Sequence, residues 1–328
     1  MKKITTLIIC LIFFGMTAQA QKVIFTKTPE GKRGLQFEGG AVLIPAKYDD
    51  FRLPQENISA VVLDKKWGFV NVMNATETVA PKYENSGDYV EGMAAVALNG
   101  KWGFVDKAGK EIVPPRYDNA MDFYDGAARV MLGGKWGFVD RTGKEIVLLK
   151  YQAVDNFSEG MSSVQLNGKW GSVDMTGKEI VAPRYDDGAK FSDGMMRVLL
   201  DGKQIFVDKT GKEIFVSKYF GTGDFSEGFA IVSANKKFGF IDKTGKEIVV
   251  MNYDFADDFS EGLAAVGMGG KYGFIDATGK EVIPLKFGSI YPIDEKADDK
   301  KYGFYDGEAK VWLDGRAFYI NKAGEEIK

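Results

Sequence analysis

The sequence predicts an all-β fold made of tandem repeats of about 34 residues, each with three short strands. A Lys-Trp-Gly-Phe-Val-Asp segment at 101–106 returns at 135–140 and, with one change, at 169–174. Short runs with a period of two residues alternate with Gly-containing turns, and helical periodicity is almost absent. We therefore expect about nine units stacked into an elongated array. A closed β-propeller is the second choice, because its blades normally have four strands and the sequence indicates three.

Each unit is expected to begin with a strand that buries one face. At 127–132, Ala128, Val130 and Leu132 share a face, and Arg129 points to the other. A Gly-Gly, Asn-Gly or Asp-Gly pair then predicts a type I′ hairpin to the second strand. An Asp-x-x-Gly turn leads to a third strand such as 145–147, which Pro ends in several copies. A Tyr and a variable stretch complete the unit.

Two kinds of position define the repeat framework, an aromatic residue and a turn glycine. The aromatic positions are Trp67, Trp102, Trp136, Trp170, Phe238 and Tyr272, and the turn glycines are Gly109, Gly143, Gly177, Gly211, Gly245 and Gly279. Because Phe and Tyr replace Trp in two copies, we interpret the aromatic column as core packing. A sugar-stacking platform is the alternative. After Tyr272 the spacing lengthens, which predicts an inserted loop at 290–300.

The first twenty residues have the composition of a secretory signal peptide. Lys2 and Lys3 precede an apolar run, and Ala18-Gln19-Ala20 fits the cleavage rule for small residues. The predicted domains are therefore a signal peptide at 1–20 and a single repeat domain at 21–328. The protein is expected in the periplasm, at the cell surface or in the medium. No later segment is long enough for a membrane-spanning helix, so no integral membrane segment is predicted after cleavage.

Composition excludes several kinds of chemistry. The chain has no His, and its one Cys, Cys10, lies in the predicted signal peptide. Ser-His-Asp and Cys-His catalysis and the usual zinc sites are thereby excluded. We predict no catalytic residue, no metal and no cofactor. The net charge is −3, with no basic stripe for a phosphate backbone, so nucleic acid is not an expected partner.

The variable stretches after each Tyr are the best candidates for binding, since repeat proteins often vary one face on a constant framework. Unconstrained linkers are the alternative. The candidates are Asp118, Met121, Asp122, Gln152, Asp155, Asp186, Asp187, Phe220, Asp224, Phe255, Asp257 and Asp258. Their acidic pairs lack the spacing of a calcium loop. The Lys-Glu dipeptides, such as Lys110-Glu111, are interpreted as solvated surface.

The repeated Lys-Trp-Gly-Phe-x-Asp-x-x-Gly-Lys-x-Ile-x-Pro-x-Tyr pattern resembles the WG-repeat family of bacterial proteins. The resemblance covers about residues 33–328, and the chain departs from it at Ser172 and at Gln204-Ile205. It implies an exported β-repeat array and says little about activity. We expect a non-enzymatic protein that binds or scaffolds another macromolecule, a protein or a glycan. The alternative is a cell-wall or extracellular glycan binder, or a carboxylate-based glycan hydrolase.

Overall fold

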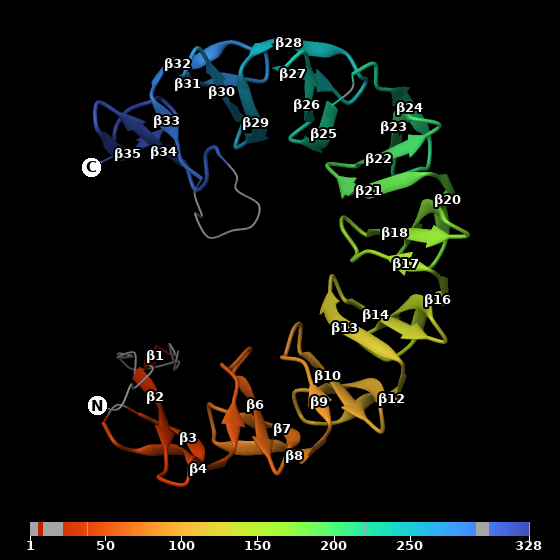
Figure 1. Cartoon of the computed structure of the whole chain (residues 1–328), viewed down its shortest axis with the longest axis vertical. Helices are drawn as coiled ribbons and strands as arrows, with labels where there is room; N and C mark the ends of the chain where they lie inside the picture. Colours follow the sequence, from red (N-terminus) through yellow and green to blue (C-terminus); the bar gives the residue numbers. More distant parts are fainter. Residues whose placement is uncertain (1–5, 9–21, 38, 220, 293–301, 328) are drawn as a thin grey trace. The chain divides into compact units, whose positions relative to one another are not determined.

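Every regular element of the described chain is a β-strand. The structure, a computed structural model, describes residues 6–8, 22–37, 39–219, 221–292 and 302–327. The chain divides into two compact units, Met1–Asn156 and Phe157–Lys328. Within each unit, antiparallel sheets follow one another in chain order (Figure 1). The described strands form separate open sheets, and none of these closes into a barrel. The prediction of an all-β tandem-repeat fold is confirmed.

The first unit holds four sheets, each built from four consecutive strands, and one last strand. The strands are β1 (Thr6–Ile8), β2 (Lys22–Lys27), β3 (Arg33–Phe37) and β4 (Val42–Tyr48); β5 (Asp50–Phe51), β6 (Ile58–Leu63), β7 (Lys66–Asn71) and β8 (Thr76–Tyr83); β9 (Asn85–Ser86), β10 (Met93–Leu98), β11 (Lys101–Asp106) and β12 (Glu111–Tyr117); β13 (Asn119–Tyr124), β14 (Ala127–Leu132), β15 (Lys135–Asp140) and β16 (Glu145–Tyr151); and β17 (Ala153–Val154).

The second unit repeats this strand order. Its strands are β18 (Met161–Leu166), β19 (Lys169–Asp174) and β20 (Glu179–Tyr185); β21 (Asp187–Ser192), β22 (Met195–Leu200), β23 (Lys203–Asp208) and β24 (Glu213–Val216); β25 (Gly221–Ser226), β26 (Phe229–Ala234), β27 (Lys237–Asp242) and β28 (Glu247–Tyr253); β29 (Phe255–Ser260), β30 (Leu263–Met268), β31 (Lys271–Asp276) and β32 (Glu281–Phe287); and β33 (Ser289–Ile290), β34 (Glu308–Leu313) and β35 (Arg316–Asn321).

Most of the described sheets have a fourth strand beside the three that the sequence predicts, and the variable stretch supplies it. In β13, Ala120 pairs with Val130 and Phe123 pairs with Ala128, so the register shifts between the two pairs. Such a bulge interrupts the alternation of buried and exposed residues. The period-two signal is therefore lost from a segment that still pairs as a strand. The candidate binding residues of these stretches lie largely on strands, and not on loops as expected.

In several sheets the first predicted strand of the repeat buries both faces, and not one as expected, whereas in β14 Arg129 is half-buried and Leu132, expected on the buried face, is 43% exposed. In β10, every residue from Met93 to Ala97 is buried. One core cluster joins Phe104 and Tyr117 of this sheet to Val130 of the next. Each such sheet therefore packs between two neighbours, which explains why the strand is almost continuously apolar.

Proline does not end the third predicted strand. β12 runs through Pro114-Pro115 to Tyr117, at the outer edge of its sheet. Its register with β11 shifts between the pairs Trp102–Tyr117 and Phe104–Val113. An edge strand with a bulge tolerates Pro, because the missing N–H is not needed by a further partner.

The glycine of the Trp-Gly pair makes this bulge possible. A Cβ on Gly103 would lie 2.2 Å from the carbonyl oxygen of Val113 and 2.7 Å from the nitrogen of Pro115. Glycine therefore lets the edge strand cross at a distance that no side chain permits.

Both predicted turn types are confirmed. The hairpin residues Asn99 and Gly100 have φ values of 52° and 70°, as a type I′ turn requires. In the following turn the Asp106 Oδ1 accepts hydrogen bonds from the amides of Ala108 and Lys110, both at 2.9 Å. The turn glycines at 109, 143, 177, 211, 245 and 279 all have positive φ, between 80° and 85°.

Both ends of the repeat array differ partly from expectation. Strand β1 lies inside the predicted signal peptide and pairs with β2, whereas Cys10 lies outside the described residues. Ile290, the first residue of the predicted insertion, belongs to β33 and pairs with Val311. Residues 293–300 of that insertion lie outside the described part of the chain.

Candidate functional site

The repeated Trp residues lie at the edge of the core. Trp102 is partly buried against its cluster, and Trp67, Trp136, Trp170, Phe238 and Tyr272 are also half-buried. The fully buried column consists instead of Tyr and Phe, for example Tyr117 and Phe104, both 0% exposed. The aromatic framework positions therefore contact the core from its edge and are not its innermost layer.

The Lys-Glu dipeptides contribute to bonds between sheets, and so their interpretation as simple solvated surface is wrong. Glu111 accepts hydrogen bonds from the Tyr83 hydroxyl at 2.6 Å and from the Lys82 Nζ at 2.9 Å. These two bonds hold the pKa of the Glu111 carboxyl below its usual range. The same Tyr–Glu bond recurs 28 or 29 residues apart at Tyr48–Glu77, Tyr117–Glu145, Tyr185–Glu213 and Tyr219–Glu247.

Two of the predicted binding residues also form hydrogen bonds between neighbouring sheets. Asp186 contacts the Lys169 Nζ at 2.6 Å and accepts the Asp201 amide at 2.9 Å. Asp118 likewise bonds Lys101 and accepts the Gly133 amide at 2.7 Å. Each carboxylate links the third strand of one sheet to the hairpin turn of the next. The lysine, followed by the backbone amide, lowers the pKa of each Asp.

Sequence reasoning missed a third set of bonds, at the turns that precede the second strand of each sheet. Glu159 accepts the amides of Asp193 and Gly194 at 2.6 and 2.9 Å and pairs with the Lys209 Nζ at 3.0 Å. Glu91 bonds the Gly126 amide and Arg141 in the same way. The recurring acidic residue before Gly was the available signal, since its spacing matches the repeat.

The other candidates are dispersed. Met121 and Gln152 are exposed, as is Asp155, which has a polar or electrostatic partner. Asp122 is half-buried, and this burial together with the Asp88 carboxylate raises its pKa, against the effect of Arg52. Phe220 lies outside the described residues.

A small hollow in the second unit collects two of the remaining candidate positions, and a third contacts one of its lining residues. Asp257 and Asp258 line a hollow of about 100 Å³ together with Tyr302. Phe255 packs on Tyr302 with ring centroids 5.7 Å apart.

One sheet breaks the repeat geometry, where Gln204-Ile205 replaces Trp-Gly. Ile205 pairs directly with Val216 and Phe206 pairs with Phe215, and β24 ends after four residues. The Ser172 departure has no such effect, since Ser172 pairs with Val181 in the ordinary bulged register. The loss of the Gly, and not of the Phe, therefore alters the edge strand.

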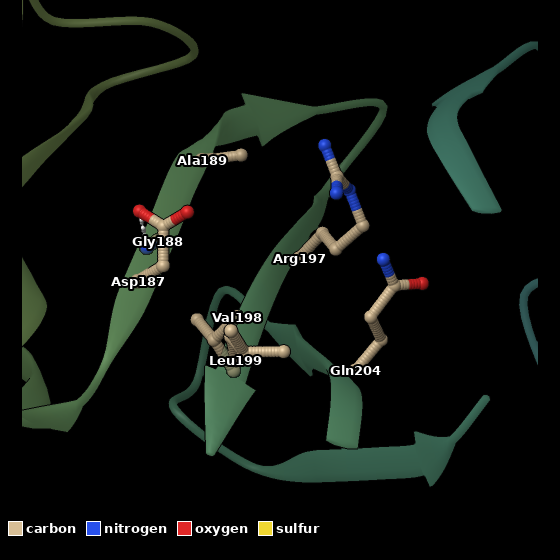
Figure 2. Close-up of a pocket in the computed structure, with 7 residues that line it drawn as sticks. All are labelled: Asp187, Gly188, Ala189, Arg197, Val198, Leu199 and Gln204. Atoms are coloured by element: carbon tan, nitrogen blue, oxygen red, sulfur yellow. Dashed lines mark hydrogen bonds between the residues drawn. The ribbon is translucent and has the colours of Figure 1, made fainter. Parts of the chain in front are cut away.

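A pocket of about 150 Å³ lies beside this irregular sheet. Figure 2 shows Asp187 and Ala189 from β21, Arg197 from β22 and Gln204 from β23 around it. The Arg197 Nε lies 3.4 Å from the Asp224 Oδ1 of the following sheet. Of the predicted binding residues, Asp187 thus lines the pocket, and Asp224 contacts a lining residue, Arg197, that the prediction did not include.

The Gln204 amide gives the pocket its most unusual feature. Its Oε1 is buried and accepts no hydrogen bond from any residue in the described ranges. A buried acceptor without a donor is costly, so such groups are rare in folded proteins. Arg197 supplies a cation, and Asp187 an exposed carboxylate whose Oδ1 accepts the Gly188 amide at 2.9 Å.

Neither a metal site nor a membrane-spanning helix is found in the structure. Across the described ranges, no three Asp, Glu, His or Cys side chains come together as a metal site requires. No helix that is long and apolar enough to cross a membrane occurs among the same residues.

The fold and its bonds define a class of protein, the tandem β-repeat proteins, and in this chain side-chain hydrogen bonds join neighbouring sheets. The model of the WG containing repeat matches at 38–67, 67–102, 102–136, 136–170, 170–203, 206–238, 238–272 and 272–296. The chain belongs to the WG-repeat family. Gln204 and Ile205 fall in the gap between two of the matches.

Similar solved structures are distant in sequence. A eukaryotic initiation factor is 9% identical, with a TM-score of 0.44 over 94% of this chain and 95% of that chain. Hsv2 of Kluyveromyces lactis is 10% identical, with a TM-score of 0.33 over 69% and 92%. A protein of unknown function from Bacteroides caccae is 14% identical, with a TM-score of 0.24 over 57% and 89%. No curated protein matches the sequence.

Proposed function

We propose that this WG-repeat protein is an exported, non-enzymatic binding protein whose variable first strands contact another macromolecule of the cell envelope or exterior. The contrast between two groups of polar residues carries the proposal. The repeated carboxylates, such as Glu111 and Asp118, are engaged in bonds between sheets. The variable strands instead place different side chains at the surface from copy to copy, such as Met121 and Asp187.

The same contrast argues against the carboxylate-based glycan hydrolase. Hydrolysis requires two carboxyl groups on opposite sides of one glycosidic bond. Of the adjacent pair Asp186-Asp187, Asp186 already bonds Lys169 and the Asp201 amide. This pair is therefore a poor candidate for hydrolysis. The proposal takes a protein as the partner, and glycan binding is an outcome of the test.

A capture experiment with two sets of variants tests this role. The first set alters the variable stretches, with Met121→Ser, Gln152→Ala and Asp187→Ala. The control set alters edge strands, with Leu148→Ser and Val250→Ser at side chains that are 68% and 67% exposed. Both sets change exposed positions, so both should fold. A partner from the native envelope should be lost with the first set and kept with the second.

Two results of that experiment would contradict the proposal. Equal capture by both sets would remove the variable strands from the interface. Release of reducing sugar from envelope glycans by the wild-type protein would make it an enzyme.

Export is tested separately by mass spectrometry of the extracellular and periplasmic fractions. The chain there should begin at Gln21, because cleavage after Ala20 fits the rule for signal peptides. An intact Met1 in those fractions would contradict export with cleavage.

A further inference from the structure

The pocket beside Gln204 lies at the position where the neighbouring repeats hold an aromatic side chain. Gln204 pairs with Leu199 in the register in which Trp170 pairs with Gln165 and Phe238 pairs with Ser233. Trp170 packs toward the next sheet, where a Cβ on Gly188 would lie 3.2 Å from its own Cβ. In the irregular sheet, the shorter Gln side chain stands where this framework otherwise carries a ring.

The size of the pocket suits one aromatic ring system. Its volume is about 150 Å³, and an apolar cavity of about this size in another protein holds a benzene molecule. Val198 and Leu199 contribute apolar surface to the lining, and Ala189 leaves one side without a long side chain. A flat ring is therefore a better fit than a branched or bulky ligand.

Arg197 adds a group that stacks well on aromatic rings. Its guanidinium lies on the same side of the sheet as the Gln204 amide (Figure 2). This chain already uses such a pair elsewhere, because the Arg52 guanidinium lies 4.2 Å from the ring centroid of Trp67. Cation–π stacking of this kind favours Trp over the other aromatic residues.

Gln204 adds an acceptor that lacks a donor. Its buried Oε1 accepts no hydrogen bond within the described structure, and rotation of the amide about its last bond turns this oxygen into the pocket, where an indole N–H would donate to it. An anionic ligand is disfavoured, because Asp187 lies in the pocket and Asp224 lies 3.4 Å from the Arg197 Nε. The shape of the pocket, stacking on Arg197 and the need for a hydrogen-bond donor thus all favour an indole ring.

We propose that the pocket formed by Asp187, Ala189, Arg197 and Gln204 binds the indole side chain of a tryptophan on a partner protein. The partner's ring takes the place that Trp102, Trp136 and Trp170 occupy in their own sheets. Arg197 stacks on the ring, and Gln204 accepts its N–H. This inference rests on the proposed binding function and names the chemistry of one contact.

Binding of indole and of benzofuran to the purified protein, followed by ligand-observed NMR titration, tests the proposal. Benzofuran has nearly the same shape but has an oxygen in place of the N–H. Indole should bind at one saturable site and more tightly than benzofuran. Gln204→Leu should weaken indole by about tenfold, the worth of one hydrogen bond, and should leave benzofuran nearly unchanged.

Two further variants separate the pocket from a general affinity for aromatic compounds. Gln204→Trp places a ring inside the pocket and should abolish binding of both probes. Arg197→Ala should weaken both, and its fold should be preserved because the matching positions hold Ser163 and Ile231. Val250→Ser, far from the pocket residues in sequence and on an exposed edge strand position, should change neither.

Absence of saturable indole binding, or equal binding by Gln204→Trp, would overturn the proposal. The proposed function fails by a different route. If the protein captures an envelope partner through its variable strands but binds no indole, only the pocket assignment is wrong. If indole binds but no macromolecule is captured, the binding function is wrong.

Discussion

The sheet formed by β13–β16 and the sheet formed by β21–β24 share one strand order. Their third strands, β15 and β23, have the same sequence except at two residues. In the first, Trp136-Gly137 allows β16 to cross close to β15 and to continue to Tyr151. In the second, Gln204-Ile205 keeps β24 in direct register, and the strand ends at Val216. The Trp-Gly pair therefore accompanies an edge strand that reaches the repeat's tyrosine, and its replacement by Gln-Ile accompanies a shorter edge strand with a pocket beside it.

The bonds between sheets survive this change. Tyr219 follows the shortened strand but still donates to the Glu247 Oε2 at 2.6 Å, as Tyr117 donates to Glu145 at 2.9 Å. The irregular sheet is thus altered within itself and remains joined to the next sheet by the same Tyr–Glu bond. Local variation is tolerated because the coupling residues lie outside the altered crossing.

The largest effect is expected when the regular sheet is given the irregular sequence at its crossing. A Cβ on Gly137 would lie 2.4 Å from the Val147 carbonyl oxygen. Gly137→Ile should therefore lower the free energy of unfolding by about 3 kcal/mol through overpacking. Chemical denaturation measures the change. Gly223→Ala is the control, since its nearest neighbour would be 3.7 Å away, and an equal loss there would contradict the account.

The next effect compares the same aromatic position in both sheets. Trp136→Ala should cost about 2–3 kcal/mol, less than for a fully buried Trp because the side chain is half-buried. Gln204→Ala should cost under about 1 kcal/mol, because a half-buried polar side chain is removed along with an unsatisfied oxygen. Melting curves of the two variants give the order, and equal losses would contradict the different packing of the two positions.

A smaller effect is expected at the Tyr–Glu bonds that both regions share. Tyr117→Phe and Tyr219→Phe each remove one hydroxyl that donates to a glutamate. Each should lower the free energy of unfolding by about 1 kcal/mol, the typical worth of such a bond. Tyr124→Phe, at a side chain that is 48% exposed, serves as the control. Losses that differ widely between the first two variants would show that the coupling is not preserved.

The smallest effect is expected on the loss of stability at low pH. Hydrogen bonds from a lysine and from a backbone amide hold the pKa of Asp118 and that of Asp186 below the usual range of an aspartate. A carboxyl with a lowered pKa stabilises the fold at neutral pH, and this contribution is lost as pH falls through its folded pKa. Asp118→Asn and Asp186→Asn should therefore flatten the decline in stability below about pH 4, measured by denaturation between pH 6 and pH 2. An unchanged slope in both would contradict these assignments.

Local rules explain why the sequence predicted the turns and missed the fourth strand. A left-handed glycine such as Gly143 and a hairpin such as Gly133-Gly134 depend on a few adjacent residues. The pairing of β13 depends on a bulge between Ala120 and Phe123, which erases the alternation that sequence reasoning requires. The sequence also did not predict that β12 continues through Pro114. A strand tolerates Pro there only because it lies at the edge of its sheet, and the sequence does not show which strand is at the edge.

The candidate site was predictable only in outline. The variable stretches and the departure at Gln204-Ile205 were visible in the sequence, and Asp187 does line the pocket there. The hydrogen bonds of Asp118 and Asp186 could not be predicted, because their partners lie 15 to 17 residues away, on another strand and in a hairpin turn. The Tyr and Glu residues recur at a constant spacing in the sequence. That they form hydrogen bonds could be seen only once the structure placed the neighbouring sheets side by side.

Restoring the family sequence in the irregular sheet tests the central claim most directly. The double variant Gln204→Trp, Ile205→Gly should let the edge strand continue past Val216 to Tyr219, as β16 continues to Tyr151. Amide hydrogen exchange at Lys218 and Tyr219 should then slow clearly relative to the wild-type protein, whereas Ser217 already donates its amide to the Gln204 carbonyl at 2.8 Å and should change little. Exchange that stays at the wild-type rate in a folded double variant would contradict the claim that these two residues set the course of the edge strand.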